Sequence, residues 1–410
     1  MQPGYPNVSI VPTPLLINGV PILPSSPRDL LSAPLIPFEY IPAPYQPQVA
    51  PLYGLMSLPL SPEHHEYYKN YGDNKAYELF ADGTYDITEQ LSITAGVRFS
   101  IEKISSSCEA GGDNKAHLGF ARNAGSNLLF MPTEKISEED TFKSWVGRLA
   151  LNYALTEDWE LYASVAKGRR PNVIQFISTP NNDGSYTSNY NIQTLNDEIV
   201  KSYELGLKGL TLGNHLYFDI AAFYYDYTDF QTSTVDENSL LIIYKDAGDA
   251  TAYGAETSLQ WQINKGVSLF GNYAYINAEF ADEDSEGNQQ SLSGNTFRLT
   301  PEHSFTLGTH MSWKINNNFN LFLRPVYKYK SKVFFEETNL EVESQDGYGL
   351  LNGRVGFEMP ENKLTVTFFM NNILNEEYLI DAGNTGRNFG IPTFIAGAPR
   401  MWGIELNVKL

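Results

Sequence analysis

Histidine and carboxylate side chains, which can ligate a metal ion, concentrate in the segment Pro62-Glu-His-His-Glu66. Neighbouring side chains in extended backbone point in opposite directions, so His64 and His65 are poorly placed to share one ion. His303 and His310, seven residues apart in one expected strand, also lie on opposite faces. We therefore expect solvated imidazoles and no metal site.

The sequence contains no catalytic signature. It has no G-x-S-x-G nucleophile elbow, no H-E-x-x-H pair and no phosphate-binding loop. The glycines of Gly347–Gly353 miss the dinucleotide-binding spacing by one residue and fall in an expected strand. The lone cysteine, Cys108, cannot form an internal disulfide. We expect neither an enzyme nor a resident cofactor, and we assign no catalytic, cofactor-binding or metal-ligating residue.

Acidic side chains gather in two segments that we expect to be loops. The first holds Glu279, Asp282, Glu283, Asp284 and Glu286, and the second holds Glu336, Glu337, Glu341, Glu343 and Asp346. Such oxygens could bind Ca²⁺ or a cationic ligand. Mutual repulsion favours extended, solvated loops instead, and that is the interpretation we adopt.

Four basic side chains are the candidate ligand-binding residues: Arg148, Arg324, Lys328 and Arg354. Each falls on the polar face of an expected strand, where it could contact an anionic ligand. Polar packing explains the same positions equally well. Their role therefore depends on the elements that carry them.

Composition narrows the class of protein. The 410 residues carry a formal net charge of −20, which excludes a general nucleic-acid binder. Aromatic residues make up 13% of the chain, yet the mean hydropathy is −0.30. No run of about 20 apolar residues could form a spanning helix. An acidic soluble β-protein and a membrane β-barrel both fit, because barrel strands alternate apolar and polar residues.

The first 74 residues differ from the rest. Fifteen of the 23 prolines lie between Pro3 and Pro62, and proline lacks the N–H that a central strand requires. We expect 1–74 to be a proline-rich loop or disordered segment and 75–410 to form the folded region. We recognise no export signal in the first residues, where the first basic side chain is Arg28.

Thirteen segments alternate with a period of two and predict β-strands. They lie at 75–86, 90–104, 141–155, 158–168, 199–211, 215–230, 250–263, 267–281, 297–314, 319–335, 347–359, 363–374 and 400–410. The connections alternate between tight turns and long segments, the long ones at 105–140, 169–198, 231–249, 282–296, 336–346 and 375–399. Short periplasmic turns and long extracellular loops are typical of outer-membrane barrels.

The alternation predicts an apolar and a polar face. The apolar positions include Leu91, Ile93, Ala95, Val97 and Phe99; Ala255, Thr257, Leu259, Trp261 and Ile263; and Trp402, Ile404, Leu406, Val408 and Leu410. The aromatic residues Tyr85, Tyr153, Trp159, Trp261, Trp313 and Phe319 lie beside short turns. This placement favours an interfacial girdle over general β-propensity.

Several motifs resemble TonB-dependent outer-membrane receptors. They are 198–208 (EIVKSYELGLK), 223–231 (FYYDYTDFQ), 252–256 (AYGAE), 294–303 (GNTFRLTPEH), 371–378 (NNILNEEY) and 397–403 (GAPRMWG), in family order. The resemblance covers about residues 50–410 and implies an all-β, antiparallel transmembrane barrel of about 22 strands around a plug domain. It also implies TonB-energised uptake of iron-siderophore complexes, vitamin B12 or similar nutrients across the outer membrane of a Gram-negative cell.

The chain departs from that pattern, because it has about 13 of about 22 strands and no recognisable plug. We expect a C-terminal barrel portion, open or incomplete and inactive alone. Its expected partners are outer-membrane lipid, an iron-siderophore complex or other nutrient, and the TonB complex through the missing plug, whose carboxylates the four basic residues could contact. One alternative, a plug-less outer-membrane barrel enzyme or adhesin, requires a complete, even-stranded barrel. A soluble acidic β-protein requires apolar side chains that point inward.

Overall fold

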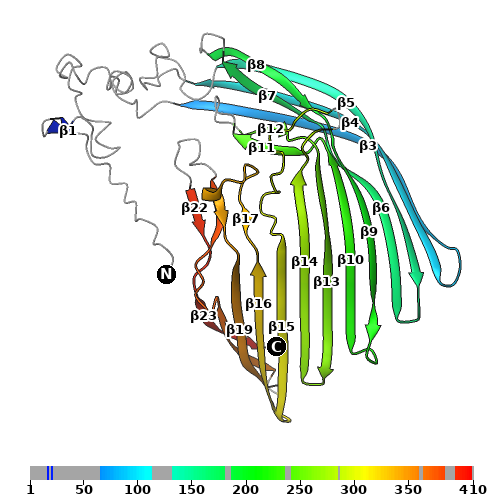
Figure 1. Cartoon of the computed structure of the whole chain (residues 1–410). Helices are drawn as coiled ribbons and strands as arrows, with labels where there is room; N and C mark the ends of the chain where they lie inside the picture. Colours follow the sequence, from blue (N-terminus) through cyan, green and yellow to red (C-terminus); the bar gives the residue numbers. More distant parts are fainter. Residues whose placement is uncertain are drawn as a thin grey trace.

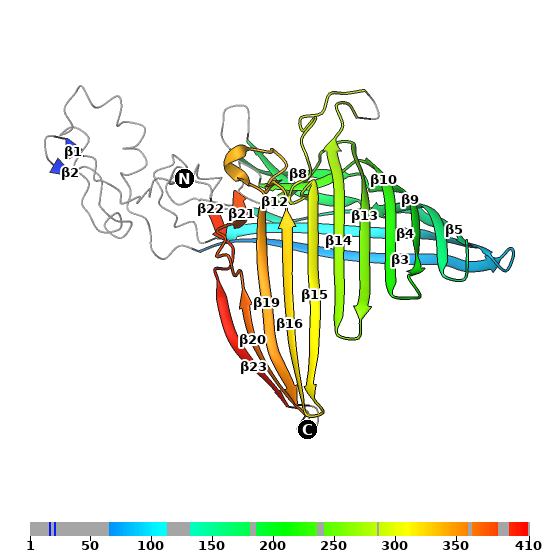
Figure 2. The same cartoon turned by 60° about the horizontal axis from the view of Figure 1, so that its bottom comes forward.

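The computed structural model describes residues 16–17, 20–21, 65–112, 132–180, 186–235, 242–284, 287–359, 363–383 and 393–408. Thirteen of its strands form one antiparallel sheet that bends round an open lumen (Figure 1, and Figure 2 after a rotation of 60°). In chain order they are β3 (Glu66–Asp86), β4 (Leu91–Gly112), β5 (Thr133–Ala154), β6 (Trp159–Arg170), β9 (Glu198–Thr211), β10 (Leu216–Thr228), β13 (Ala250–Asn264), β14 (Val267–Phe280), β15 (His303–Asn316), β16 (Phe319–Lys330), β19 (Tyr348–Met359), β20 (Leu364–Asn371) and β23 (Met401–Val408). The predicted all-β antiparallel fold is confirmed, with each strand paired to the next in this order.

Antiparallel partners share a face of a sheet, so the strand register shows which side chains lie together. Leu259 of β13 pairs with Phe218 of β10, and Ile404 of β23 pairs with Phe368 of β20. These apolar residues lie on one face, and Ile404 is 68% exposed because no second layer covers it. An exposed apolar face contradicts the soluble β-protein, which would bury these residues.

The polar face lines the lumen. Tyr162 of β6, Glu204 of β9 and Lys328 of β16 border the same cavity, although several strands separate β6 from β16 in the sheet. Side chains of distant strands can meet only on the concave side of a curved sheet. The apolar face is therefore the convex, outer one, as in a membrane barrel.

Aromatic side chains form two belts on the outer face. The lower belt contains the residues predicted beside the short turns, and Phe319 of this belt stacks on Phe357 with ring centroids 5.1 Å apart. The register also places a second belt higher on the same face, at Tyr203, Tyr224, Tyr253, Tyr275, Phe305, Tyr327 and Tyr329. Two such belts flank the apolar band of transmembrane barrels.

The sheet does not close, because β3 and β23 each pair on one side only among the described residues. The prediction of an open barrel is therefore confirmed. Each edge strand presents a row of unpaired N–H and C=O groups, and in hydrocarbon such groups cost several kcal/mol each. The two edges are the part of the wall that most requires a pairing partner.

Several strand limits differ from those predicted. β3 begins at Glu66 instead of residue 75, and β5 begins at Thr133 instead of residue 141. The added residues lie above the apolar band and are mostly polar, so a search for apolar alternation does not find them. β15 begins at His303 instead of residue 297, because Pro301 lacks an N–H and Leu299 adopts a φ of +58°.

The connections that follow β6, β10, β16 and β20 contain β-hairpins and are not simple loops, which corrects the prediction. The predicted strand 319–335 ends as β16 at Lys330, and its residues 333–334 belong to one of these hairpins. The hairpins are β7 (Val173–Pro180) with β8 (Tyr186–Leu195), β11 (Gln231–Val235) with β12 (Ile242–Asp246), β17 (Val333–Phe334) with β18 (Ser344–Gln345), and β21 (Leu379–Gly383) with β22 (Thr393–Ala396). A 3₁₀ turn, η4 (Glu341–Glu343), precedes β18, and a small separate hairpin joins β1 (Leu16–Ile17) to β2 (Val20–Pro21). The four hairpins stand at the upper end of the sheet (Figure 1).

Buried apolar clusters lie at this upper end instead of inside the wall. One surrounds Cys108 and Phe176, a second surrounds Phe280, and a third contains Phe335. A one-layer sheet has no interior, so a conventional core forms only where the hairpins cover the strand ends.

Two glycines on opposite faces of the wall test how tightly the strands pack. A methyl group at Gly254 would overlap the backbone carbonyl of Tyr275 and crowd the ring of Phe223, whereas one at Gly271 would meet its nearest atom at 3.5 Å. We expect Gly254→Ala to lower the free energy of unfolding by about 1–3 kcal/mol, the usual cost of overpacking. Urea titration of the full chain in detergent micelles, followed by tryptophan fluorescence, measures the change.

Gly271→Ala is the matched control and should leave the urea midpoint unchanged. Equal midpoints for the two variants would contradict the packing seen around Gly254.

Candidate functional site

All four predicted basic residues lie on the lumenal face, but they do not form one site. Arg148 of β5 donates from Nε to Oδ2 and from Nη2 to Oδ1 of Asp82 on β3, each at 3.0 Å. Because both of these guanidinium nitrogens are engaged, the residue ties β5 to β3 across β4. Six strands separate β5 from β16 in the sheet order, so Arg148 stands apart from the other three residues.

Arg324, Lys328 and Arg354 do lie together, on β16 and β19. Arg324 and Arg354 are direct cross-strand partners, an arrangement that is unfavourable for like charges. Arg324 lies over the ring of Phe322, with 4.4 Å from its guanidinium carbon to the ring centroid, and its Nη2 is 3.9 Å from Oε1 of Glu358. This part of the wall therefore presents positive charge to the lumen.

A lumenal groove of about 590 Å³ separates this basic wall from an acidic one. Glu204, Asp219 and Glu256 line one side from three neighbouring strands, β9, β10 and β13. Lys328 and Lys330 of β16 line the other side. The groove can hold a zwitterionic surface or one with charges of both signs.

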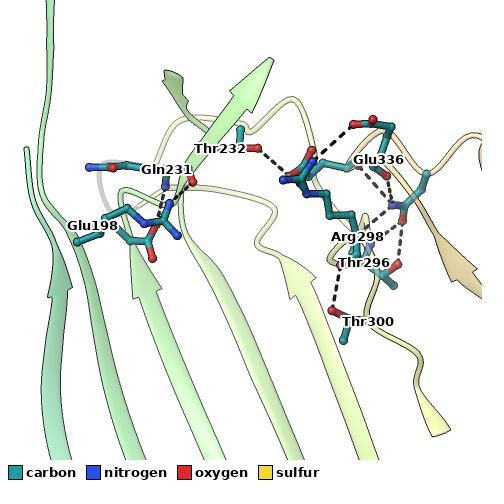
Figure 3. A network of polar contacts seen from close by, with 10 residues as sticks. Glu198, Gln231, Thr232, Thr296, Arg298, Thr300 and Glu336 are labelled. Carbon is teal, nitrogen blue, oxygen red and sulfur yellow. Dashed lines mark hydrogen bonds and ion pairs between the residues drawn. The ribbon is translucent and has the colours of Figure 1, made fainter. Parts of the chain in front are cut away.

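A second candidate site lies at the upper rim, where Gln231 is held by a dense set of hydrogen bonds (Figure 3). Its backbone N–H donates to Oε2 of Glu198 at 2.8 Å, and its Nε2 donates to the carbonyls of Pro171 and Asn196. Arg170 pairs with Glu198 at 3.1 Å and also donates to the Gln231 carbonyl. Gln231 is 3% exposed, so its side chain is fixed.

Gln231 borders a rim cavity of about 370 Å³. Its side-chain oxygen has no hydrogen-bond partner within the described part of the chain. A buried acceptor without a donor costs free energy, and an N–H or O–H group of a bound ligand would satisfy it.

The other side of the rim cavity is built around Arg298 and Glu337. The Thr232 hydroxyl donates to Oε1 of Glu337 at 2.7 Å, and Nε of Arg298 lies 3.3 Å from the same oxygen (Figure 3). Asn339 holds this corner, because it accepts from the Thr296 N–H at 2.7 Å and donates to the Thr296 carbonyl. Asn339 adopts a φ of +50°, which asparagine tolerates better than most residues.

Phenylalanine rings form the base of the rim cavity. Phe230, Phe280 and Phe297 contact one another with centroid distances between 4.9 and 5.3 Å, and all three line the cavity. With Arg170, Arg298 and Glu337 at the walls, the cavity combines aromatic surface, two guanidinium groups that are each paired with a carboxylate, and the Gln231 acceptor. This combination suits a ligand with aromatic rings and anionic or hydroxyl oxygens.

Burial and a neighbouring carboxylate raise the pKa of one acidic side chain at the rim. Asp229 precedes the Phe230–Gln231 pair, and burial together with the negative charge of Asp246 raises its pKa, against a hydrogen bond from Asn196. A raised pKa means that the charged carboxylate is held in an unfavourable place.

The acidic segments are more structured than the extended, solvated loops that were predicted. Glu343 is 2% exposed, Asp284 accepts from Asn288, and Lys332 pairs with Glu341. Hydrogen bonds and nearby cations offset the repulsion among these carboxylates. Within the described residues, no three His, Cys, Asp or Glu side chains are grouped so that they could hold a metal ion.

The histidines follow the predicted geometry where it can be seen. His303 pairs with Tyr275 on the outer face and His310 with Ser268 on the lumenal face. His64 lies outside the described residues, and so does Leu410.

Sequence reasoning did not predict the rim site: Glu337 was noted only as part of an acidic segment, Gln231 and Arg298 only within family motifs, and Arg170 not at all. These residues come from four different long connections or strand ends, and Thr232 and Glu337 are 105 positions apart. A further signal was the pair Arg169-Arg170 at the end of an apolar strand, which marks an upper boundary but not a site.

The wall and the rim cavity together define a class of protein: a membrane β-barrel wall with a ligand-sized cavity at its long-loop end. Among the described residues, no helix is both long and apolar enough to cross a membrane. A family model described as TonB dependent receptor-like, beta-barrel, matches residues 36–373, and the chain belongs to that family. Barrels of this family are outer-membrane proteins of Gram-negative bacteria.

Two relatives place the chain within the family. It is 24% identical over 328 residues to the pesticin receptor of Yersinia pestis, covering 77% of this chain and 43% of that protein. It is 25% identical over 248 residues to the ferric-pyoverdine 358 receptor of Pseudomonas putida, covering 58% of this chain and 27% of that protein. The chain thus spans less than half the length of these relatives.

Solved structures show the same fold. The ferric yersiniabactin uptake receptor FyuA from Yersinia pestis superposes with a TM-score of 0.67 at 20% identity, over 83% of this chain and 46% of the other. The siderophore receptor PiuA from Acinetobacter baumannii gives 0.56 at 15% identity, over 82% and 43%.

The raised pKa of Asp229 predicts a pH-dependent effect of its charge. A carboxyl whose folded pKa is raised stabilises the fold below the unfolded pKa, and this contribution is lost as the pH rises through the folded pKa. At pH 7 we therefore expect Asp229→Asn to raise the unfolding midpoint by roughly 1–2 °C. Below the ordinary aspartate pKa of 3.8 the difference should disappear. Thermal unfolding in micelles at both pH values measures it.

Asp158→Asn, at the opposite rim of the sheet, is the control and should change neither midpoint. A lower midpoint for Asp229→Asn at pH 7 would show that the charge is stabilising and would refute the assignment.

Proposed function

We propose that the chain forms a wall of an outer-membrane receptor for active uptake of iron-siderophore complexes or similar scarce nutrients. The observation that carries the proposal is the two-faced wall of a TonB-dependent receptor barrel, apolar outside and polar inside. In this role the outer face contacts membrane lipid. The long connections at the upper end lie outside the cell, where the nutrient arrives.

The chemistry of the rim cavity supports a ferric chelate as ligand class. Siderophores bind iron through oxygen-rich groups that are often carried on aromatic rings, and their complexes are commonly anionic. Phe230 and Phe297 offer ring surface, Arg298 offers positive charge and Gln231 offers a buried acceptor. The ferric-pyoverdine 358 receptor and the ferric yersiniabactin uptake receptor FyuA are described as receptors for such complexes, which agrees with this class.

The proposal gives the lumenal residues a partner. In this family's mechanism an inner-membrane TonB complex supplies energy by acting on a plug domain inside the barrel. Arg324, Lys328 and Arg354 would contact carboxylates of that plug, and Glu204 and Glu256 would contact its basic groups across the groove. Arg148 is committed to Asp82 and would contribute to the shape of the wall.

Uptake by the source bacterium tests the proposal. Deleting the gene should abolish ⁵⁵Fe uptake from one class of ferric siderophore, tested as a panel of catecholate, phenolate and hydroxamate chelates. Chromosomal Arg298→Gln should raise the half-saturating ligand concentration about tenfold, equivalent to about 1.4 kcal/mol of binding. Arg298→Lys keeps the charge and should retain part of the affinity.

Lys265→Gln, in the turn between β13 and β14, removes a charge from the opposite rim and should leave uptake unchanged. If the deletion strain takes up every chelate of the panel, as well as vitamin B12, at the parental rate, the proposal fails.

A further inference from the structure

Lysines mark the upper limit of the apolar band on five neighbouring strands. On the outer face of each strand, the first charged side chain above the band is a lysine. These residues, which we call the lysine row, are Lys75 of β3, Lys103 of β4, Lys143 of β5, Lys167 of β6 and Lys201 of β9. Strand register joins four of them in two pairs, because Lys75 pairs with Lys103 and Lys167 pairs with Lys201.

The lysine row lies on the membrane-facing side of the wall. Lys143 pairs with Ile101, in the register that also pairs Trp145 with Phe99. The apolar residues directly below the row are widely exposed: Tyr77, Leu79, Phe99, Ile101, Trp145, Leu149, Val165, Tyr203 and Leu205. Lys167 lies over the ring of Trp145, with its Nζ 4.4 Å from the ring centroid.

The row is confined to this arc of the barrel. On β10 the corresponding first charge is Asp226, and on β14 it is Glu279. The outward positions of β13, β15, β16 and β19 carry no Lys, Arg, Asp or Glu within the strand limits. General anchoring of a barrel at the membrane interface would distribute lysines around the whole wall. An arc of five adjacent strands indicates a local binding surface instead.

The ammonium groups remain accessible. Lys75, Lys103 and Lys201 have carboxylate neighbours at 3.6, 2.7 and 3.3 Å, namely Asp73, Glu139 and Asp226. Both members of each pair are at least 38% exposed, and exposed ion pairs of this kind are weak. Lys143 and Lys167 have no carboxylate within ion-pair distance in the described part of the chain. The patch is therefore positive, although the chain as a whole carries −20.

A lysine at the upper limit of the apolar band is well placed to bind a phosphorylated lipid headgroup. Its aliphatic stem can lie along the apolar surface while the ammonium group reaches the headgroup layer. Lys167 lies three residues before the end of β6 and Lys201 three residues after the start of β9, on either side of a long connection. The row therefore lies toward the long-connection end, which is the extracellular end in the proposed membrane placement. We infer that the lysine row binds the phosphate groups of lipids in the outer leaflet along the arc from β3 to β9. This inference rests on the outer-membrane placement proposed above.

Binding of lipid A to the full chain in detergent micelles tests the inference. Lipid A carries two phosphate groups on an acylated sugar, and native mass spectrometry or a fluorescence titration reports its binding. The variant Lys103→Gln/Lys143→Gln/Lys167→Gln should bind more weakly by about fivefold for each lysine removed, and these factors multiply. The corresponding triple Arg variant keeps the charge and should retain the affinity.

Three exposed lysines at the short-turn end provide the matched control. Lys265→Gln/Lys314→Gln/Lys363→Gln removes the same charge and should leave lipid A binding unchanged. Dephosphorylated lipid A should bind no better to the parent chain than to the lysine-row variant. Circular dichroism of every variant verifies that the strand content is retained.

Equal binding of lipid A by the parent and by a folded lysine-row variant would overturn the inference. Equal binding of dephosphorylated lipid by the parent would also overturn it, since the acyl chains would then suffice. Competition by millimolar inorganic phosphate would point to a site for the free anion instead of a lipid surface. None of these outcomes depends on iron uptake, so failure here is distinguishable from failure of the proposed function.

Discussion

The wall depends on one constraint: in a paired β-strand, successive side chains point to opposite faces, and antiparallel neighbours keep the same facing. Twelve consecutive strand pairings connect β3 to β23, and in each of them the outward residues of one strand pair with the outward residues of the next. The register shifts only near the ends of strands, for example at Gln262–Asn264. A one-residue slip in any pairing would place charged side chains in lipid and apolar side chains in the lumen. Apolar band, lumenal charges and aromatic belts are all consequences of this shared register.

The upper rim is governed by a different kind of interaction. Where the strands leave the apolar band, side-chain hydrogen bonds and small buried clusters replace the regular ladder. Gln231 shows the change clearly: it begins the first hairpin strand after β10, yet it is held by Glu198 at the start of β9 and by Pro171 and Asn196 between β6 and β9. This rigid support leaves a buried acceptor on a residue that borders a cavity, and polar groups fixed in this way favour specific recognition of a ligand.

Most of the fold could be predicted from the sequence, and little of the rim site could. Thirteen strands were recoverable because apolar side chains at alternate positions mark the membrane-crossing part of each strand. The polar extension of β3 to Glu66 and the hairpins could not be predicted in this way, because the alternation of apolar residues does not continue into them. Arg324, Lys328 and Arg354 were predicted to face the lumen and do so, but their separation from Arg148 required the strand order of the sheet.

The sequence by itself determined the two-faced strands, the alternation of short and long connections, and the family, because each is encoded by neighbouring residues. Tertiary structure alone decided which side chains meet. Thr232 contacts Glu337 across 105 positions, and the strand register pairs Lys75 with Lys103 and Lys167 with Lys201. The physical reason is curvature: bending the sheet joins residues of distant strands on its concave side, and the register aligns residues of neighbouring strands on its convex side. Neither relation is visible in local spacing.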